Sequence, residues 1–403
     1  DWYKSPARGF FAFKGKIIMS YLMSNYAPLP VTFVKGDGCY LTDDKGDIYL
    51  DALCGVAVTG LGHSHPKISK AIQSQAQQLL HTSNWYHIQH QETLAEVLCK
   101  LADMDGAFFS NSGAEANEAA IKIARLHAHA NQIDEPIILT AKQSFHGRTM
   151  ATLSATGNPK VQAGFSPLVS EFIHINFNDI KAIQAYEDNP QISAIMLEPI
   201  QGESGVIVPD ANYLNQVQEI CQKNNWLLIL DEVQTGIGRT GKMFAHQYNQ
   251  ITPDILTLAK GLGNGVPIGA CLAKGKAAKL LTPGTHGSTF GGNPLVCRVA
   301  LEVLNVIKQD DILHNVNLMS DYITARFTDQ LHTVDSVLEI RSKGLMIAIE
   351  LTKDCSQLLQ QALDKKVLIN ITGQSIRLLP PLIINKEQAD EMVDTICQLV
   401  SEL

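Results

Sequence analysis

The sequence lacks the features that mark several large classes of protein. Its formal net charge of -8 leaves no basic excess of the kind that binds nucleic acid. No apolar run approaches the roughly 18 residues of a membrane-spanning helix, and we find no internal repeat, low-complexity tract or linker. We therefore expect no nucleic-acid partner and no membrane span.

Closely spaced cysteines are also absent. The eight cysteines are scattered without a C-x-x-C pair, which is typical of reduced thiols in a cytosolic protein. His63 and His65 share a loop but have no acidic or cysteine partner at ligand spacing, so we expect no metal site. In residues 1–18, Lys14 and Lys16 interrupt the apolar run and no small-residue cleavage site follows. We expect this stretch to be an extension outside the fold rather than a secretory signal.

What the chain does contain is material for a large core. Hydrophobic residues make up 45% of its 403 residues and charged residues 18%, which favours two or three packed units and argues against disorder. We predict strands over 106–109, 136–140, 192–197, 226–230 and 255–259, with helices over 94–101, 115–130 and 213–224. Strands this apolar are covered on both faces, as in a parallel sheet that binds ligands at the carboxyl ends of its strands.

The two ends of the chain have a different pattern. Turn residues split 31–50 into short strands of a meander, and a helix is expected over 66–80. After Pro294 the chain predicts a smaller α/β unit. Its expected helices cover 295–308, 313–331, 355–364 and the segment from Lys386, and its strands 337–341, 345–351, 367–370 and 376–379.

Lys260 ends one of the apolar segments, and three glycines follow it within five residues. A buried lysine tends to lose its proton, and a neutral amine is a nucleophile that can form a Schiff base with a carbonyl. The alternative is a surface lysine before a glycine-rich turn, and Lys260 by itself favours that alternative.

Two turns of small residues can bind phosphate. In the first, Ser112 and Glu115 fit a capping box at a helix start, where free N–H groups favour an anion, and Gly113 and Ala114 let a ligand approach the backbone. An ordinary helix cap would explain Ser112 alone. The second turn contains Ser288 and its hydroxyl-bearing neighbour Thr289.

Four further side chains are candidates for binding. Phe145 can stack on a flat ring and Arg148 can hold a carboxylate, although a core Phe and a surface Arg are common. Asp231 follows a fully apolar strand and needs a cation such as a protonated ring nitrogen, unless it is a helix cap or a structural ion pair. Arg377, inside an apolar run, either projects into a cleft or caps a sheet edge. Together with Lys260 and the two turns, these are the parts that a pyridoxal-phosphate enzyme needs.

The sequence resembles class III, the ω-amino-acid branch of the fold type I pyridoxal-phosphate aminotransferases, from about Tyr26 to its C-terminus. The motifs that carry the resemblance are Ser112-Gly113-Ala114-Glu115-Ala116-Asn117, Phe145-His146-Gly147-Arg148-Thr149, Glu198-Pro199-Ile200-Gln201-Gly202-Glu203, Asp231-Glu232-Val233-Gln234-Thr235-Gly236, Ala259-Lys260 and Gly287-Ser288-Thr289-Phe290-Gly291-Gly292-Asn293-Pro294. It implies an α/β fold with a mainly parallel seven-stranded sheet in a large domain over 60–295. It also implies a small α/β domain over 296–403, and a segment over 19–59 that joins the small domain and the dimer interface.

The resemblance implies a set of residues that bind pyridoxal 5′-phosphate. Lys260 would carry the cofactor as a Schiff base and shuttle a proton, Asp231 would pair with the pyridine nitrogen, and Phe145 would stack on the ring. The other expected cofactor contacts are Ser112, Gly113, Ala114, His146, Gln234, Ser288 and Thr289. Thr289 would reach the phosphate from the partner subunit, so the resemblance implies a homodimer with shared active sites.

The expected substrates follow from the same resemblance, which is strongest to the branch that transfers the δ-amine of N-acetylornithine to 2-oxoglutarate in arginine biosynthesis. Arg148 and Tyr26 would hold the carboxylate far from the reacting amine. Arg377 would bind the α-carboxylate of glutamate, with Glu203 neutralising it when the other substrate binds. Val56 stands where ornithine aminotransferases have a tyrosine and offers no polar partner to a free α-amine.

Three alternatives remain open from the sequence. The first is another ω-aminotransferase, acting on ornithine, 4-aminobutyrate or succinylated substrates, since Thr59 replaces an asparagine of many bacterial members. The second is a related enzyme with different chemistry, an aminomutase or a decarboxylase. The third is a protein that has kept the fold without the activity.

Overall fold

The largest element of the fold is a seven-stranded sheet in the order β6-β12-β11-β10-β9-β7-β8. In this computed structural model, residues 10–13, 16–19 and 21–403 are described. The seven strands are β6 (Gly106–Ser110), β7 (Ile137–Ala141), β8 (Phe172–Ile175), β9 (Ile192–Leu197), β10 (Leu227–Asp231), β11 (Ile255–Leu258) and β12 (Gly269–Ala273). All neighbours are parallel except the pairs that β12 makes with β11 and β6. The predicted fold class, α/β with a mainly parallel sheet, is confirmed.

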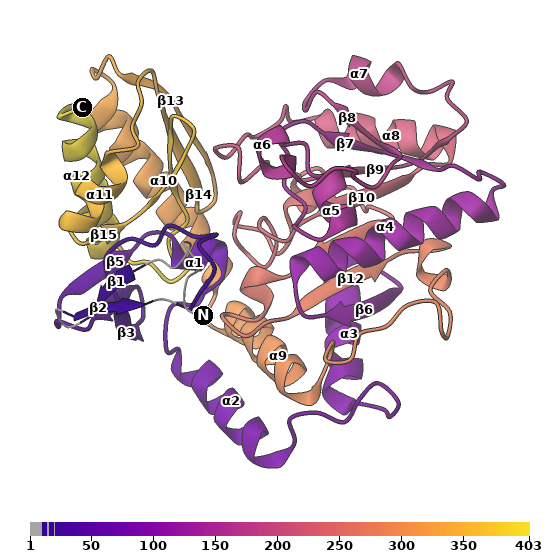
Figure 1. Cartoon of the computed structure of the whole chain (residues 1–403), viewed down its shortest axis with the longest axis horizontal. Coiled ribbons are helices and arrows are strands. Elements are labelled where there is room, and N and C mark those ends of the chain that lie inside the picture. The colour runs from indigo at the N-terminus through magenta and orange to yellow at the C-terminus, as the bar shows by residue number, and fades with distance from the viewer. Residues whose placement is uncertain (1–9, 14–15, 20) are drawn as a thin grey trace, which may run out of the picture.

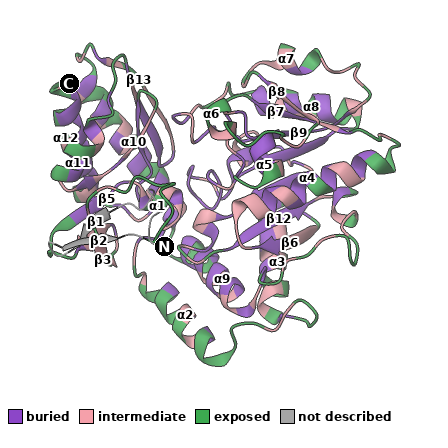
Figure 2. Cartoon of the chain, viewed as in Figure 1, coloured by how far each residue is buried: buried purple, intermediate pink, exposed green. Residues whose placement is uncertain are grey.

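The central strands are apolar throughout because helices cover both of their faces. Alternate residues of β9 enter separate clusters: Ala194 and Met196 pack on the side of α4 (Gly113–Ala130), whereas Ile195 and Leu197 pack on the side of α8 (Tyr213–Asn224). Figure 1 shows α4 running across one face of the sheet, and Figure 2 shows the strands themselves as buried.

The sequence prediction missed two strands of this sheet, β8 and β12. β8 has only four residues and is half-buried over most of its length, so its apolar signal is weak. β12 is fully buried, but an apolar run of Gly, Ala, Cys and Leu carries no information about strand direction. Its antiparallel insertion between β6 and β11 is decided by tertiary pairing.

A second, antiparallel sheet is built from the C-terminal part of the chain, in the order β13-β14-β17-β16. Its strands are β13 (Val337–Lys343), β14 (Met346–Leu351), β16 (Asn370–Thr372) and β17 (Ser375–Leu378). The helices of this part are α9 (Pro294–Gln309), α10 (Ile312–Leu331), α11 (Leu358–Asp364) and α12 (Lys386–Ser401). The predicted helices and strands after Pro294 are therefore present, with the strand expected near 367–370 divided into two short strands.

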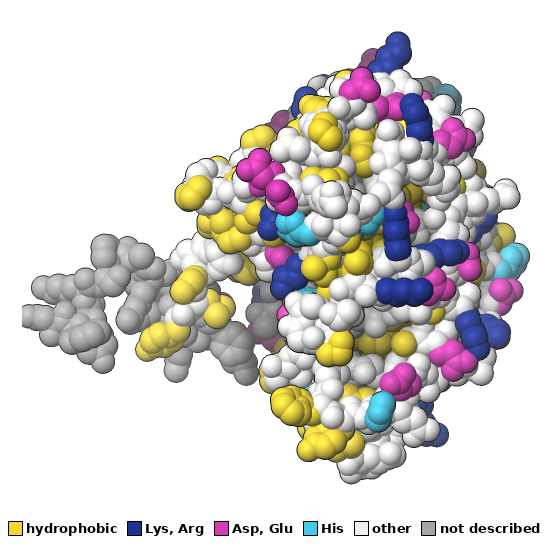
Figure 3. Space-filling model, turned by 90° about the vertical axis from the view of Figure 1, so that its right-hand side faces the viewer, with side chains coloured by type: hydrophobic (Ala, Val, Ile, Leu, Met, Phe, Trp, Pro, Cys, Tyr) yellow, Lys and Arg dark blue, Asp and Glu magenta, His cyan; other side chains and the backbone are white. Residues whose placement is uncertain are grey.

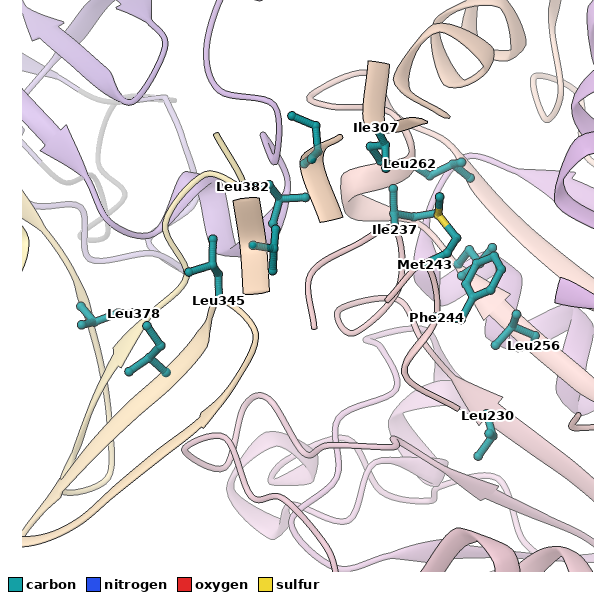
Figure 4. Packing of buried hydrophobic residues seen from close by; sticks show 14 of the residues in the cluster. Leu230, Ile237, Met243, Phe244, Leu256, Leu262, Ile307, Leu345, Leu378 and Leu382 are labelled. Atoms are coloured by element: carbon teal, nitrogen blue, oxygen red, sulfur yellow. The ribbon is translucent and has the colours of Figure 1, made fainter. Parts of the chain in front are cut away.

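A third sheet joins the two ends of the chain. The meander β3 (Phe33–Asp37), β4 (Tyr40–Asp43) and β5 (Ile48–Asp51) was predicted, and β5 also pairs in parallel with β15 (Val367–Leu368). The hydrophobic core is continuous between the parts of the molecule. In Figure 4, Leu382 lies between Leu345 on one side and Ile307 on the other, and Leu382 lines one small cavity together with Ile237 and Ile307.

The remaining elements are short or peripheral. They are β1 (Phe10–Phe13), β2 (Lys16–Met19), α1 (Cys54–Ala57), α2 (Pro66–Gln78), α3 (Gln89–Ala102), α5 (Met150–Ala155), α6 (Pro159–Gln162), α7 (Ile180–Gln184) and the 3-10 turns η1 (Ala245–Tyr248), η2 (Lys260–Leu262) and η3 (Ala277–Lys279). Most of the predicted extension 1–18 lies outside the described residues or has no described side chains, and β1 and β2 pair only with each other. No helix in the described ranges is long and apolar enough to cross a membrane.

Candidate active site

A cavity of about 420 Å³ opens where the carboxyl ends of β6, β9, β10 and β11 meet. Parallel strands place the residues that follow them at one edge of the sheet, so segments far apart in the sequence converge there. Among the sequence-predicted site residues, those that line the cavity are Ser112, Gly113, Ala114, Phe145, His146, Arg148, Glu203, Asp231, Gln234 and Lys260.

Lys260 follows β11 by two positions and lies in the cavity wall, with its backbone in the left-handed region at φ 42°. Burial lowers the pKa of its ammonium group, and the Glu203 carboxylate opposes that shift. The neutral amine, which is the nucleophilic form, is therefore favoured relative to an exposed lysine.

Asp231, at the end of β10, is fixed by a buried hydrogen-bond network. Its Oδ2 is 2.8 Å from Nδ1 of His146 and accepts from Nδ2 of Asn117 at 2.7 Å, while Oδ1 accepts the Val233 N–H at 3.0 Å. Asn117 also donates to the His146 carbonyl and accepts from the Thr257 hydroxyl. The carboxylate is 4% exposed and faces the cavity, so it is held ready for a cationic partner there.

The start of α4 forms the end of the cavity expected to bind phosphate. The Glu115 N–H donates to Ser112 Oγ at 3.2 Å, as a capping box requires. The reciprocal bond differs from the prediction, because the Glu115 carboxylate accepts from the Asn111 N–H at 2.6 Å and not from the Ser112 N–H. The Gly113 and Ala114 N–H groups have no acceptor among the described residues. A Cβ on Gly113 would lie 2.7 Å from Val233, so this close approach needs glycine.

Two loops hold the ring-stacking and arginine candidates. Arg148 lies at the exposed rim with its Cζ 5.5 Å from the centroid of the Phe145 ring, and no carboxylate of the described chain pairs with it. On the opposite loop, Gln234 Nε2 donates to Glu203 at 3.3 Å, and Gln234 Oε1 is buried with no partner in the described part of the chain.

Arg377 forms an ion pair with Glu203 behind the cavity wall. Its Nη1 is 2.8 Å from Glu203 Oε1 and donates to the Gly202 carbonyl at 2.9 Å. Because β17 lies between β14 and β16, Arg377 does not cap a sheet edge. Burial raises the pKa of Glu203, but the Arg377 guanidinium outweighs it and leaves that pKa below its ordinary value.

Several predicted residues do not line the cavity of this single chain. Tyr26 is 83% exposed and Thr289 is also exposed, whereas Ser288 accepts from Nδ2 of the cavity residue Asn111 at 3.2 Å. Val56 adopts φ 64° in the turn α1 and packs against the cluster that contains Met346. Its neighbour Val58 lines the cavity instead.

Sequence reasoning gave no role to Asn117, Glu198 or Asn111, which the structure places in the cavity wall. Asn117 and Glu198 stood inside quoted motifs, so a signal was present. A polar residue in an otherwise apolar helix face or strand end must find buried partners, and that requirement identifies both residues.

The residues of the cavity fit pyridoxal phosphate, the cofactor that the resemblance implies. Free N–H groups at the start of α4 suit a phosphate, Asp231 suits a protonated ring nitrogen, and the unpartnered Gln234 side chain suits a polar ring substituent. Lys260 provides an amine to bond an aldehyde, and the Phe145 ring lines the same space.

Comparisons with known proteins agree with this geometry. The model of the family "Aminotransferase class-III" matches residues 21–400. The acetylornithine aminotransferase of Nitrosomonas europaea is 53% identical, covering 95% of this chain and 98% of that protein. The enzyme of the same name from Aquifex aeolicus is 44% identical, covering 95% of this chain and 100% of that protein.

Solved structures give a similar result. An ornithine aminotransferase from Toxoplasma gondii superposes with a TM-score of 0.91 at 34% identity, covering 94% of this chain and 92% of that one. An acetylornithine aminotransferase from Elizabethkingia anophelis gives a TM-score of 0.86 at 35% identity, covering 94% of this chain and 96% of that one.

Proposed function

The chain belongs to the class-III aminotransferases, which use pyridoxal 5′-phosphate, and we propose that it transfers the δ-amine of N-acetylornithine to 2-oxoglutarate. The products would be N-acetylglutamate 5-semialdehyde and glutamate, a step of arginine biosynthesis. Support comes from relatives of that name at 43–53% identity over most of the chain.

One observation supports these substrates. Of the two candidate arginines, only Arg377 is neutralised by a carboxylate among the described residues. Arg148, at the cavity rim, pairs with no carboxylate of the described residues, whereas Arg377 is paired with Glu203. N-Acetylornithine presents a remote amine and needs only one arginine for its single carboxylate. Glutamate has two carboxylates, so it needs the second arginine released from Glu203.

The proposed roles of the side chains follow their positions. When bound, the cofactor supplies an aldehyde that bonds amines and a ring that withdraws electrons. Lys260 Nζ is placed to bond that aldehyde and, once released, to move the proton, while Asp231 holds the ring nitrogen protonated with support from His146. The remaining proposed cofactor contacts are the Phe145 ring, the Gln234 amide, the Ser112 turn with the N–H groups of Gly113 and Ala114, and the hydroxyls of Ser288 and Thr289.

We further propose that the active unit is a homodimer in which Thr289 of one subunit completes the other subunit's phosphate site. The loop beside Thr289 carries Phe290, which is 61% exposed, and the neighbouring segment carries Trp85 and Tyr86, exposed by 91% and 72%. Asn84 ties the two segments together through the Ser288 and Gly291 carbonyls. Figure 3 shows exposed hydrophobic side chains gathered in patches, as expected of a surface that a protein partner covers.

The division of the chain into domains and its cellular location belong to the same proposal. We propose a large domain over 60–295 and a small domain over 296–403 to which the segment 19–59 is attached, with the pairing of β5 and β15 as support. A cytoplasmic location agrees with eight cysteines that are all free.

A substrate panel tests the proposal. We expect kcat/KM with 2-oxoglutarate as acceptor to be highest for N-acetylornithine, followed by ornithine and 4-aminobutyrate. A faster reaction with ornithine would overturn the choice of donor, and that alternative is the one favoured by the Toxoplasma gondii neighbour. Failure to form glutamate from 2-oxoglutarate would instead point to different chemistry, such as that of an aminomutase.

A further inference from the structure

We propose that Glu198 is a positioning residue that sets the spacing between Arg148 and Arg377. The inference rests on the proposed function, because it assumes that these two arginines together bind a dicarboxylate. Glu198 has no role among the site residues expected from the sequence, and binding of substrate by Arg148 and Arg377 does not by itself assign it one.

The geometry of Glu198 is that of a clamp between two loops. It follows β9 directly, is 6% exposed and lines the cavity. Its Oε2 accepts the Phe145 N–H at 3.0 Å, and its Oε1 accepts the Gly202 N–H at 3.3 Å. Each oxygen therefore serves a different loop, and one side chain determines how far apart the two loops stand.

The first of these loops leads to Arg148. Phe145 is three residues before it, and the Arg148 guanidinium lies over the Phe145 ring with Cζ 5.5 Å from the centroid. The loop is also held from its other side, because the His146 N–H donates to the Thr156 hydroxyl at 2.9 Å. A shift of the Phe145 backbone would therefore move the support on which Arg148 rests.

The second loop leads to Arg377 through a single residue. Gly202 donates its N–H to Glu198 and accepts from Arg377 Nη1 at 2.9 Å through its carbonyl. The next residue, Glu203, is the ion-pair partner of Arg377. Gly202 is packed closely, since a Cβ there would lie 2.0 Å from the Gln234 side chain. The arginine and its counter-ion are thus both tied to the backbone that Glu198 holds.

The ionised carboxylate, the main form of Glu198 above its pKa of about 7 and therefore the form to titrate, is suited to this clamp because both of its oxygens accept hydrogen bonds. A glutamine at the same place has one accepting oxygen, and its NH₂ group would oppose one of the two N–H groups. An aspartate keeps the charge but is one methylene shorter, so it cannot reach both loops. Either change should release one loop and alter the distance between the arginines.

Binding of dicarboxylates should detect that distance, whereas binding of monocarboxylates should not. Glutarate lacks both the amine and the ketone and can engage both arginines at once, so its affinity depends on their spacing. Butyrate engages one arginine and is indifferent to the position of the other. Neither ligand requires turnover, which separates the measurement from the identity of the natural donor.

The test is calorimetric titration of the holoenzyme with glutarate and with butyrate. For Glu198→Gln and Glu198→Asp we expect glutarate to bind about tenfold more weakly, the usual cost of a lost hydrogen bond to a charged group, and butyrate to change less than about twofold. The matched control is Glu232→Gln, which should change both affinities by less than about twofold. Glu232 is 1% exposed and also accepts from two backbone N–H groups, but these belong to Ala245 and His246, and none of these three residues lines the cavity.

Several outcomes would overturn the inference. If the affinities for glutarate and butyrate fell equally, Glu198 would support the whole site and not the spacing of the arginines. If Glu198→Asp bound glutarate with wild-type affinity, the charge of the side chain and not its length would matter. Glu198→Asp also keeps the test valid if Glu198→Gln does not retain the cofactor. Failure of the proposed function has a different signature: the wild-type enzyme would not use N-acetylornithine, or would bind glutarate no better than butyrate.

Discussion

The two ends of the active-site cavity are built differently. At the Asp231 end Asn117 alone joins Asp231, the His146 carbonyl and Thr257, and in the described part of the chain His146 Nε2 is the buried atom of this network that lacks a partner. At the Arg377 end the counter-ion Glu203 has a side chain that is 34% exposed. In the described part of the chain, Arg377 Nε and Gln234 Oε1 are buried there without partners.

The difference indicates which end is fixed and which can rearrange. A buried network in which one residue, Asn117, serves three partners is costly to disturb, because each displaced group loses a hydrogen bond in a medium without water. The Arg377–Glu203 pair has one partly exposed member, and an unused donor (Arg377 Nε) and an unused acceptor (Gln234 Oε1) lie beside it, so it can exchange partners at a smaller cost. We infer that the end proposed for the cofactor is preformed, and that the end proposed for substrate is where the two substrates are told apart.

The largest effect is expected at Lys260, which lies between the two ends. Lys260→Ala removes the amine that we propose bonds the cofactor and moves the proton, so turnover should fall on the order of 10³-fold or more. The visible absorbance of the lysine-linked cofactor should disappear as well. Steady-state kinetics and an absorbance spectrum check both expectations, and retained turnover would refute the assignment of this lysine.

Substitutions at the two ends of the cavity should lower the stability of the protein by different amounts. Asn117→Ala leaves the buried His146 carbonyl and Thr257 hydroxyl without their printed partner and takes one hydrogen bond from Asp231, so the free energy of unfolding should drop by about 3 kcal/mol or more. Gln234→Ala, at the end that can rearrange, removes only the 3.3 Å bond to Glu203, which keeps Arg377 as its partner, so it should cost about 1 kcal/mol. Urea denaturation of both variants tests this. Asn305→Ala, at an exposed helix position, serves as the control and should change stability by less than about 0.5 kcal/mol.

Glu198 should make the stability of the cofactor-free protein depend on pH. Burial raises the pKa of Glu198 from 4.5 to about 7, with His146 opposing the shift and Asp231 adding to it. A raised folded-state pKa means that the folded protein holds a proton that the unfolded chain releases. The stabilisation is therefore complete below pH 4.5 and is lost as the pH rises through about 7.

The size of that effect can be measured against a variant without the titrating group. Between pH 4.5 and 7 the wild-type protein should lose about 3 kcal/mol of stability relative to Glu198→Gln, which cannot titrate. Denaturation curves at several pH values for both proteins give the difference. A difference that stays constant with pH, or that grows as the pH rises, would show that Glu198 is not protonated more readily in the folded state.

The smallest effect is expected from Glu203→Gln, which removes the charge that masks Arg377. The arginine would then be open to an α-carboxylate at all times, so the ratio of kcat/KM for N-acetylornithine to that for glutamate should fall about tenfold. Glu302→Gln is a suitable control, because Glu302 pairs with Arg298 on the same helix and neither residue lines the cavity. An unchanged ratio in Glu203→Gln would mean that the end of the cavity at Arg377 does not discriminate between the substrates.

Much of the fold and of the site could be predicted from the sequence, for one physical reason. Continuous apolar runs mark strands covered on both faces, and the carboxyl ends of parallel strands meet at one edge. That rule places the residues after β10 and β11, and those after β6, beside one another, and the structure puts Asp231, Lys260 and Gly113 in one cavity. The direction of β12 was not predictable, because an apolar run of small residues pairs equally well in either direction.

The hydrogen-bond and packing partners of each side chain could not be predicted from the sequence. The bond from Glu115 to the Asn111 N–H, the three contacts of Asn117 and the packing of Val56 away from the cavity depend on distances between segments that local patterns do not specify. Glu198 is the clearest case, because its two acceptor bonds reach residues 53 positions before it and 4 after it.

The sequence by itself determined the class of fold, because periodicity marks buried strands, and it determined the family through the motifs that carry the resemblance. It also predicted that Lys260, Asp231 and the Ser112 turn, which all follow strands, would meet in one cavity. Only the tertiary structure decided which groups are paired and which are left free. Hydrogen bonds act over about 3 Å, and positions to that accuracy exist only after the loops have packed against one another. The contrast between the paired network at Asp231 and the rearrangeable ion pair at Arg377 is therefore a property of the folded chain.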